Sequence, residues 1–123
     1  MTGRPRLHGL ALVGVLLLAA LLRIHEAAQD RRFHPDEALY ATFARDAVAY
    51  GDWFFPGALD KPPLYPYAAA VAMHFTAAQR TDAGVIDVPV VQGEFAARLP
   101  NIFAGIVAVG LVYALALALG SRR

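Results

Sequence analysis

Two neighbouring carboxylates and one lysine are the side chains whose types and spacing could do chemistry in this chain. Asp36 and Glu37 stand together directly after a histidine and a proline, and Lys61 stands directly before two prolines. A carboxylate at the edge of an apolar surface can act as a general base toward a hydroxyl group. Acidic residues in a first helical turn are also common because they complement the helix dipole, so a structural role stays open for both. A lysine near a membrane can instead contact lipid headgroups.

Metal chemistry is the other option that these residue types raise. His34 could join Asp36 in binding a divalent cation, but a lone histidine before a helix is more often a capping or surface residue. The chain has no cysteine, which removes disulfides, thiol catalysis and thiolate metal sites together. We therefore predict no dedicated metal and no cofactor.

Two hydrophobic segments place these residues next to a membrane. Hydrophobic residues make up 58% of the chain, and its mean hydropathy is +0.45. The first run, residues 7–22, is shorter than the roughly 20 residues that cross a bilayer upright, but Arg23 can extend its charge to the interface, so we expect a span at 7–24. The second run, 99–119, starts with Pro100 in a first helical turn and is the stronger span. We predict an all-α membrane protein with two transmembrane helices.

Charge placement predicts the orientation of these spans. The chain ends carry arginines, whereas all 10 acidic residues lie between Glu26 and Glu94. Because cytoplasmic segments are enriched in Lys and Arg, both termini should be cytoplasmic and residues 25–98 should form an extracytoplasmic loop of a plasma (inner) membrane protein. The competing interpretation of the first run is a secretory signal, with Ala27-Ala28 as a weak cleavage site. No basic cluster with interleaved aromatic residues is present, so we expect no nucleic-acid partner.

The loop is expected to contain two juxtamembrane amphipathic helices. The first should cover residues 36–50, because Pro35 suits a first helical turn and Gly51 stands where a C-terminal glycine is expected. The second, near residues 64–77, is too short to cross a bilayer and should lie in the interface. Between this helix and the second span, residues 85–91 could pair as a short strand, although an internal proline argues against a central one.

The spacing of apolar residues predicts which side of the first helix is buried. This predicted face consists of Leu39, Tyr40, Phe43, Ala44, Ala47 and Val48. Asp36 would border the face, whereas Glu37 would share a row with Ala41 and look toward water. Glu94 and Arg98, further along the chain, have the spacing of a helical ion pair.

Four short motifs follow one another along the chain. They are Asp36-Glu37-Ala38-x-Tyr40-Ala41-x-x-Ala44-Arg45, Gly51-Asp52-Trp53, Asp60-Lys61-Pro62-Pro63-Leu64 and Glu94-Phe95-Ala96-Ala97-Arg98-Leu99-Pro100. In this order they resemble the N-terminal region of polyprenyl-phosphate-sugar glycosyltransferases, the large GT-C membrane enzymes of the protein mannosyltransferase and aminoarabinose transferase type (glycosyltransferase family 39). The resemblance covers nearly the whole chain. It implies a GT-C fold and transfer of a sugar from a polyprenyl-phosphate donor to an extracytoplasmic acceptor.

The resemblance also implies roles for individual residues. Asp36 matches the acid that faces the catalytic cavity, and it would accept the proton of the acceptor hydroxyl. Lys61 matches a lysine that contacts the phosphate of the donor, where its charge would neutralise the departing polyprenyl phosphate. Glu37 and Asp60 are the further substrate-binding residues expected, although the family often has Glu in place of Asp60.

The length of the chain leads to a further expectation. Two spans and one loop cannot enclose a polyprenyl-phosphate sugar, so we expect an N-terminal fragment that is inactive without further spans of the same enzyme. The expected partners are the lipid-linked donor, membrane lipids and those missing spans. The alternative is a small two-span protein that binds lipid phosphate or a larger transferase, through the small-residue row of Gly110, Ala114 and Ala118. A weaker third interpretation is a signal-peptide protein with a C-terminal anchor.

Overall fold

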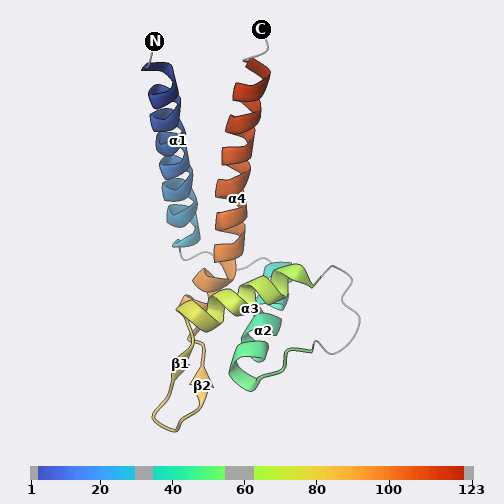
Figure 1. The fold of residues 1–123 in the computed structure, drawn as a ribbon. Coiled ribbons are helices and arrows are strands. Elements are labelled where there is room, and N and C mark those ends of the chain that lie inside the picture. Colours follow the sequence, from blue (N-terminus) through green and yellow to red (C-terminus); the bar gives the residue numbers. More distant parts are fainter. Residues whose placement is uncertain (1–2, 30–34, 55–62, 121–123) are drawn as a thin grey trace. The chain divides into compact units, whose positions relative to one another are not determined.

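The computed structural model describes residues 3–29, 35–54 and 63–120, and these are mostly helical. The elements in chain order are α1 (Gly3–Ala27), α2 (Pro35–Tyr50), α3 (Leu64–Thr76), β1 (Gln79–Arg80), β2 (Ile86–Asp87) and α4 (Val90–Gly120) (Figure 1). The chain divides into two compact units, of which unit 1 comprises Met1–Gln29 with Asn101–Arg123 and unit 2 comprises Asp30–Pro100. Helix α4 therefore contributes its first part to unit 2 and its longer second part to unit 1.

Unit 1 is a pair of antiparallel helices. The beginning of α1 and the end of α4 lie at the same end of this unit (Figure 1). Near that end, the hydroxyl of Tyr113 donates a hydrogen bond to the carbonyl oxygen of His8 at 2.9 Å. Further along, a Cβ atom added at Gly110 would lie 3.6 Å from Leu16, so the small residue brings α4 close to α1. Gly110, which the alternative interpretation of the sequence placed in a partner-binding row of small residues, thus faces α1.

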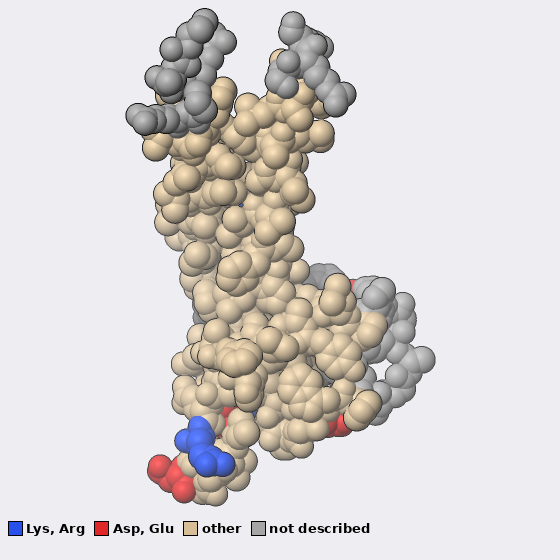
Figure 2. All heavy atoms as spheres, in the orientation of Figure 1, with Lys and Arg blue, Asp and Glu red and all other residues tan. Residues whose placement is uncertain are grey.

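The helices α1 and α4 are both long and apolar enough to cross a membrane. The candidate spans are Leu7–Ala27 and Val90–Gly120, and only 6% of the most apolar window of each is buried in the protein. On the face shown in Figure 2, the described surface of unit 1 consists mainly of uncharged side chains. A soluble protein rarely exposes so large an apolar surface, so composition and exposure together favour a membrane protein.

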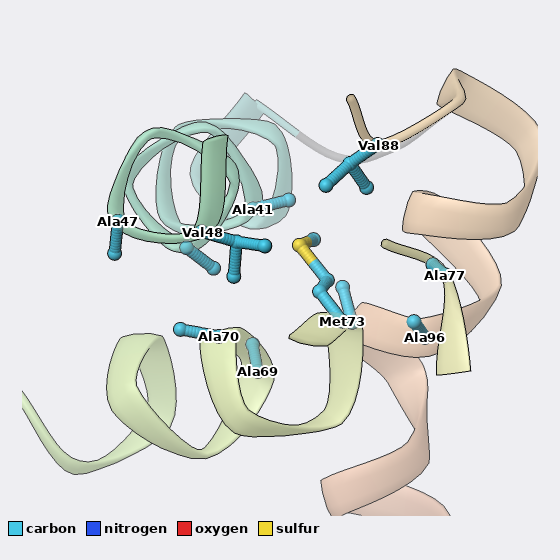
Figure 3. Close-up of a cluster of buried hydrophobic side chains, with 11 residues drawn as sticks. Ala41, Ala47, Val48, Ala69, Ala70, Met73, Ala77, Val88 and Ala96 are labelled. Carbon is cyan, nitrogen blue, oxygen red and sulfur yellow. The ribbon is translucent and has the colours of Figure 1, made fainter. Parts of the chain in front are cut away.

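Unit 2 has a small core between α2, α3 and the beginning of α4. Its cluster consists of Ala41, Ala44, Ala47, Val48, Ala69, Ala70, Met73, Ala77, Val88, Ala96 and Ala97. Eight of these eleven residues are alanines, so the helix backbones approach closely and Met73 supplies the largest fully buried side chain. Figure 3 shows Met73 extending from α3 toward α2, among Ala41, Val48 and Val88. Leu39 of α2 and Leu64 and Phe75 of α3, by contrast, are exposed.

The buried face of α2 matches the predicted one only in part, since Ala44, Ala47 and Val48 are buried as expected. Leu39, predicted to be buried, is 50% exposed, whereas Ala41, predicted to look toward water, is 7% exposed. The face that packs on α3 follows the row of Ala41, Ala44 and Val48. Alanine on both helices permits a close approach into which a leucine side chain would not fit, and tertiary packing therefore overrides the apolar pattern.

Helix α4 begins nine residues earlier than the span predicted at 99–119. Pro100, expected in a first turn, lies inside this helix, where it lacks the N–H that would bond to the carbonyl four residues before it. The helix continues through this position because the preceding turns bury Ala96 and Ala97 in the core of unit 2. Burial of an amphipathic face, more than local propensity, stabilises such segments.

A short hairpin precedes α4. Strand β1 pairs with β2 in antiparallel register, with Gln79 opposite Asp87 and Arg80 opposite Ile86. Gly84 turns the chain with a φ of 79°, a left-handed conformation that glycine adopts without steric cost. The strand expected within 85–91 is thus limited to two residues, and the chain leaves it before the proline that follows.

Candidate functional site

Two of the predicted site residues lie in the described part of the chain. Asp36 and Glu37 occupy the first turn of α2, as the sequence predicted, where carboxylates are stabilised by the helix dipole. Asp60 and Lys61, predicted to bind the donor, lie outside the described residues, and so does His34. The geometry of the candidate site is therefore built around the beginning of α2.

Glu37 forms an ion pair with Arg98 across unit 2. The Nε atom of Arg98 donates a hydrogen bond to Oε1 of Glu37 at 3.3 Å, and the two side chains are 16% and 30% exposed, respectively. Glu37 was predicted to look toward water, and this is wrong, because it belongs to the same helical row as Ala41, Ala44 and Val48, which faces the core. Asp36, expected to have the more unusual environment, is the exposed carboxylate of the two.

The ion pair joins segments that are far apart in the sequence. Arg98 lies 61 residues after Glu37 and belongs to the first part of α4. From its spacing we expected Arg98 to pair with Glu94 on its own helix, but the partner that the structure shows is Glu37. The opposite charges of Glu37 and Arg98 were a signal for this contact, but the same two motifs also contain Asp36, Arg45 and Glu94, so the sequence does not single out this pair.

Tyr65 connects α3 to the first part of α4, next to Arg98. Its hydroxyl donates a hydrogen bond to the carbonyl oxygen of Ala97 at 3.1 Å. Its ring contacts that of Tyr40 edge to face, with 6.1 Å between ring centroids and 86° between ring planes. Burial raises the pKa of the Tyr65 hydroxyl above 10.0, the charge of Glu37 raises it further, and Arg98 acts in the opposite direction. The hydroxyl therefore stays protonated and serves as a hydrogen-bond donor at neutral pH.

The sequence motifs converge through these contacts. Glu37 belongs to the first motif and Arg98 to the fourth, and Tyr65 directly follows the third. The second motif is included because the hydroxyl of Tyr67 donates a hydrogen bond to the carbonyl oxygen of Trp53 at 3.0 Å. The first and fourth motifs are thus in direct contact, and α3, which begins at the last residue of the third motif, contacts the second and the fourth. Asp60, Lys61 and Pro62 of the third motif lie outside the described residues. The motifs can be recognised in the sequence, but the contacts between them could not be predicted from it.

A second ion pair holds α2 to the hairpin. Arg45 donates from Nε to the carbonyl oxygen of Val88 at 3.2 Å and from Nη2 to Oδ1 of Asp87 at 3.3 Å. Both side chains of this ion pair are nearly half exposed. Beside it is a hollow of about 210 Å³, with Thr42 and Glu94 in its lining. This contact is structural, since it fixes the end of β2 on α2.

The arrangement provides an accessible carboxylate beside a fixed framework. Asp36 is exposed at the beginning of α2, while the next residue anchors that turn to α4 through Arg98. Such a carboxylate can accept a proton from a group that approaches the exposed turn. Among residues 3–29, 35–54 and 63–120, no group of three or more potential metal ligands lies close together.

The chain matches no known protein in the comparisons. Models of known protein families, curated proteins and solved structures include none that is significantly similar to it. Roles for Asp36 and its neighbours therefore depend on the geometry above and on the motifs in the sequence.

Proposed function

We propose that this chain is the N-terminal portion of a membrane glycosyltransferase that transfers a sugar from a polyprenyl-phosphate donor to an extracytoplasmic hydroxyl group. The observation that carries the proposal is the contact between the first and fourth motifs. Glu37 of the first motif contacts Arg98 of the fourth, and α3 contacts Ala97 of the fourth motif through Tyr65 and Trp53 of the second through Tyr67. Contact between motif residues that lie 61 positions apart is expected if these motifs belong to one site.

Asp36 is the proposed base of this reaction. The acceptor oxygen attacks the anomeric carbon, and the bond between that carbon and the phosphate oxygen breaks in the same displacement. Polyprenyl phosphate leaves with the bonding electron pair, and Asp36 takes the proton of the acceptor hydroxyl. A single displacement of this kind inverts the configuration at the anomeric carbon. Exposure of Asp36 supports this role, since a base must be open to its substrate.

The remaining predicted site residues have different roles in the proposal. Lys61 neutralises the phosphate of the leaving group, and Asp60 lies next to it in the donor-binding segment. Glu37 was expected to bind substrate, but its carboxylate contacts Arg98 in the structure. We therefore assign Glu37 the positioning of the Asp36 turn, through its ion pair.

The proposed topology puts this site on the extracytoplasmic side of the plasma (inner) membrane. The beginning of α1 and the end of α4 share one end of unit 1, which supports termini on the same side. Arginines at both chain ends favour the cytoplasm for that side. In unit 2, Leu64, Val71 and Phe75 form an exposed apolar row on one side of α3, as expected of a helix in the membrane interface.

Sugar transfer by the product of the native gene tests the proposal. Membranes containing that product are supplied with a labelled polyprenyl-phosphate sugar, and transfer to acceptor is measured for the wild type, Asp36→Asn and Asp82→Asn. General bases contribute about 10²–10⁴-fold to rate, so we expect Asp36→Asn to lose transfer by at least this lower factor. Asp82→Asn, a matched change in the exposed turn of the hairpin, should leave transfer unchanged. Equal transfer by the wild type and Asp36→Asn would remove Asp36 from the mechanism.

The mass of the same product separates the proposal from its alternative. A tag at the N-terminus should report a polypeptide well above 13.2 kDa if these residues are part of a complete transferase. A stable product of 13.2 kDa without transfer activity would instead indicate a small two-span protein.

A further inference from the structure

Unit 1 contains an apolar groove along its two helices. The groove has a volume of about 430 Å³ and lies within this unit. It is lined by Val15 and Arg23 of α1 and by Gly105, Ala108, Val109, Val112, Tyr113 and Ala116 of α4. Arg23 is the charged residue of this lining, and the other side chains present carbon atoms or an aromatic ring.

Arg23 lies against the backbone of α4 at one end of the groove. A Cβ atom added at Gly105 would collide with the Arg23 side chain, so the glycine makes room for it. One terminal nitrogen of Arg23 donates a hydrogen bond to the carbonyl oxygen of Ala19 at 3.3 Å. In the part of the chain that the structure describes, no carboxylate forms an ion pair with Arg23. A cation that none of the described carboxylates pairs with, beside an apolar groove, favours an anionic ligand with an apolar tail.

The groove has the length of one membrane leaflet. At a rise of 1.5 Å per residue, Val15 to Arg23 covers about 12 Å of α1 and Gly105 to Ala116 covers about 16 Å of α4. Half of a hydrocarbon core of about 30 Å is close to both values. Arg23 stands four residues before the end of α1 at Ala27, which places its charge at the depth where lipid phosphates begin.

We propose that this groove binds an anionic phospholipid of the leaflet at the Ala27 end of α1. One acyl chain occupies the groove, and the phosphate accepts hydrogen bonds from the guanidinium of Arg23. A guanidinium presents several donors in a plane that matches phosphate oxygens. This lipid site is independent of the proposed glycosyltransferase activity, because its residues belong to unit 1 and none is a motif residue. The competing occupant is a carboxylate on another transmembrane helix, which the test below distinguishes.

Lipid retention provides the first test. The full chain as the host makes it is reconstituted in nanodiscs of equimolar phosphatidylglycerol and phosphatidylcholine with identical acyl chains, released in mild detergent and examined by mass spectrometry. We expect retained lipid to be enriched in phosphatidylglycerol about fivefold, the ratio for one cation attracting one anionic headgroup near the surface. Arg23→Gln should lose this enrichment. Arg80→Gln, which removes an exposed charge of the hairpin, is the matched control and should keep it.

A second variant leaves Arg23 in place. Ala108→Leu fills the apolar part of the groove, so it should reduce the number of retained lipids without changing the charge of the protein. This variant keeps the proposal testable if Arg23→Gln fails to insert. An enrichment that survives Arg23→Gln, or that Arg80→Gln removes equally, would overturn the proposal.

Crosslinking identifies the occupant directly. A photoreactive residue in place of Val112, in the middle of the groove, should give adducts with phospholipid in host membranes. Adducts with a polypeptide helix in place of lipid would also overturn the proposal and would point to a carboxylate-bearing partner for Arg23.

Discussion

The ion pair between Glu37 and Arg98 should stabilise unit 2 more than the ion pair between Arg45 and Asp87. Both pairs have a nitrogen to oxygen distance of 3.3 Å, so geometry does not separate them. The two pairs differ in burial. The side chains of Arg98 and Glu37 are 16% and 30% exposed, whereas those of Arg45 and Asp87 are 46% and 49% exposed. The two pairs thus isolate the effect of burial on one kind of contact.

The expected magnitudes follow from these exposures. Exposed ion pairs contribute about 0.2–1 kcal/mol, while removal of one partner from a fully buried pair costs about 3–5 kcal/mol. For the half-buried pair of Glu37 and Arg98 we expect a coupling free energy of about 1 kcal/mol and a cost of about 2 kcal/mol for each single substitution. For Arg45 and Asp87 we expect a coupling free energy of about 0.3 kcal/mol.

Double-mutant cycles measured by hydrogen exchange provide the assay. The cycles use Glu37→Gln with Arg98→Gln, and Asp87→Asn with Arg45→Gln, in the full chain in detergent. Exchange of the α2 amides reports local opening of unit 2, which makes unfolding of the apolar helices unnecessary. Each cycle subtracts the cost of leaving one partner unpaired, so it isolates the interaction between the two side chains.

One result would refute this reasoning. If the coupling free energy of Glu37 and Arg98 is no larger than that of Arg45 and Asp87, burial does not strengthen the pair. The link between the first and fourth motifs would then be a surface contact without an effect on the position of Asp36.

Further predictions concern the core and the buried tyrosine. Met73→Ala should lower the free energy of opening of unit 2 by about 2–5 kcal/mol, because it leaves a cavity at a fully buried side chain. Gly93→Ala should cost about 1–3 kcal/mol, since its Cβ would lie 2.9 Å from the side chain of Val88. Because the pKa of Tyr65 is raised in the folded state, folding retains its proton, and stability should fall as pH rises from 10.0 through the raised pKa. Hydrogen exchange of unit 2 measures the stability changes in Met73→Ala and Gly93→Ala, and the same measurement at several pH values tests the prediction for Tyr65.

Matched variants keep these predictions specific. Val71→Ala, on the exposed side of the same helix as Met73, should change stability by less than about 0.5 kcal/mol. Tyr65→Phe should remove the part of the stability loss above pH 10.0 that comes from ionisation of the Tyr65 hydroxyl. Glu37→Gln should lower the pKa of Tyr65, because it removes a nearby negative charge. An unchanged alkaline profile in Tyr65→Phe, or equal losses in Met73→Ala and Val71→Ala, would contradict the described packing.

Local sequence was sufficient for the position of most helices. The ranges predicted at 36–50 and 64–77 are helical in the structure as α2 (Pro35–Tyr50) and α3 (Leu64–Thr76). Proline before α2 and glycine after it act within a few residues, so no knowledge of the fold was needed. Long apolar runs likewise predicted the two helices able to cross a membrane, because span length and composition are properties of one segment.

Contacts between distant segments could not be predicted from the sequence. The apolar pattern of α2 pointed to Leu39 as buried, yet the close approach of two alanine rows decided the face and turned Glu37 toward Arg98. The roles assigned to Asp36 and Glu37 changed accordingly, because Glu37 forms an ion pair with Arg98, 61 residues further along the chain.

Sequence by itself thus determined where helices form, which of them can cross a membrane and where acidic residues begin α2. Tertiary structure alone decided which face of α2 is buried, how far α4 extends before Pro100 and which side chain pairs with Glu37. The physical reason is that helix formation depends on neighbours within a turn or two, whereas the buried face depends on the shape of the surface that it meets.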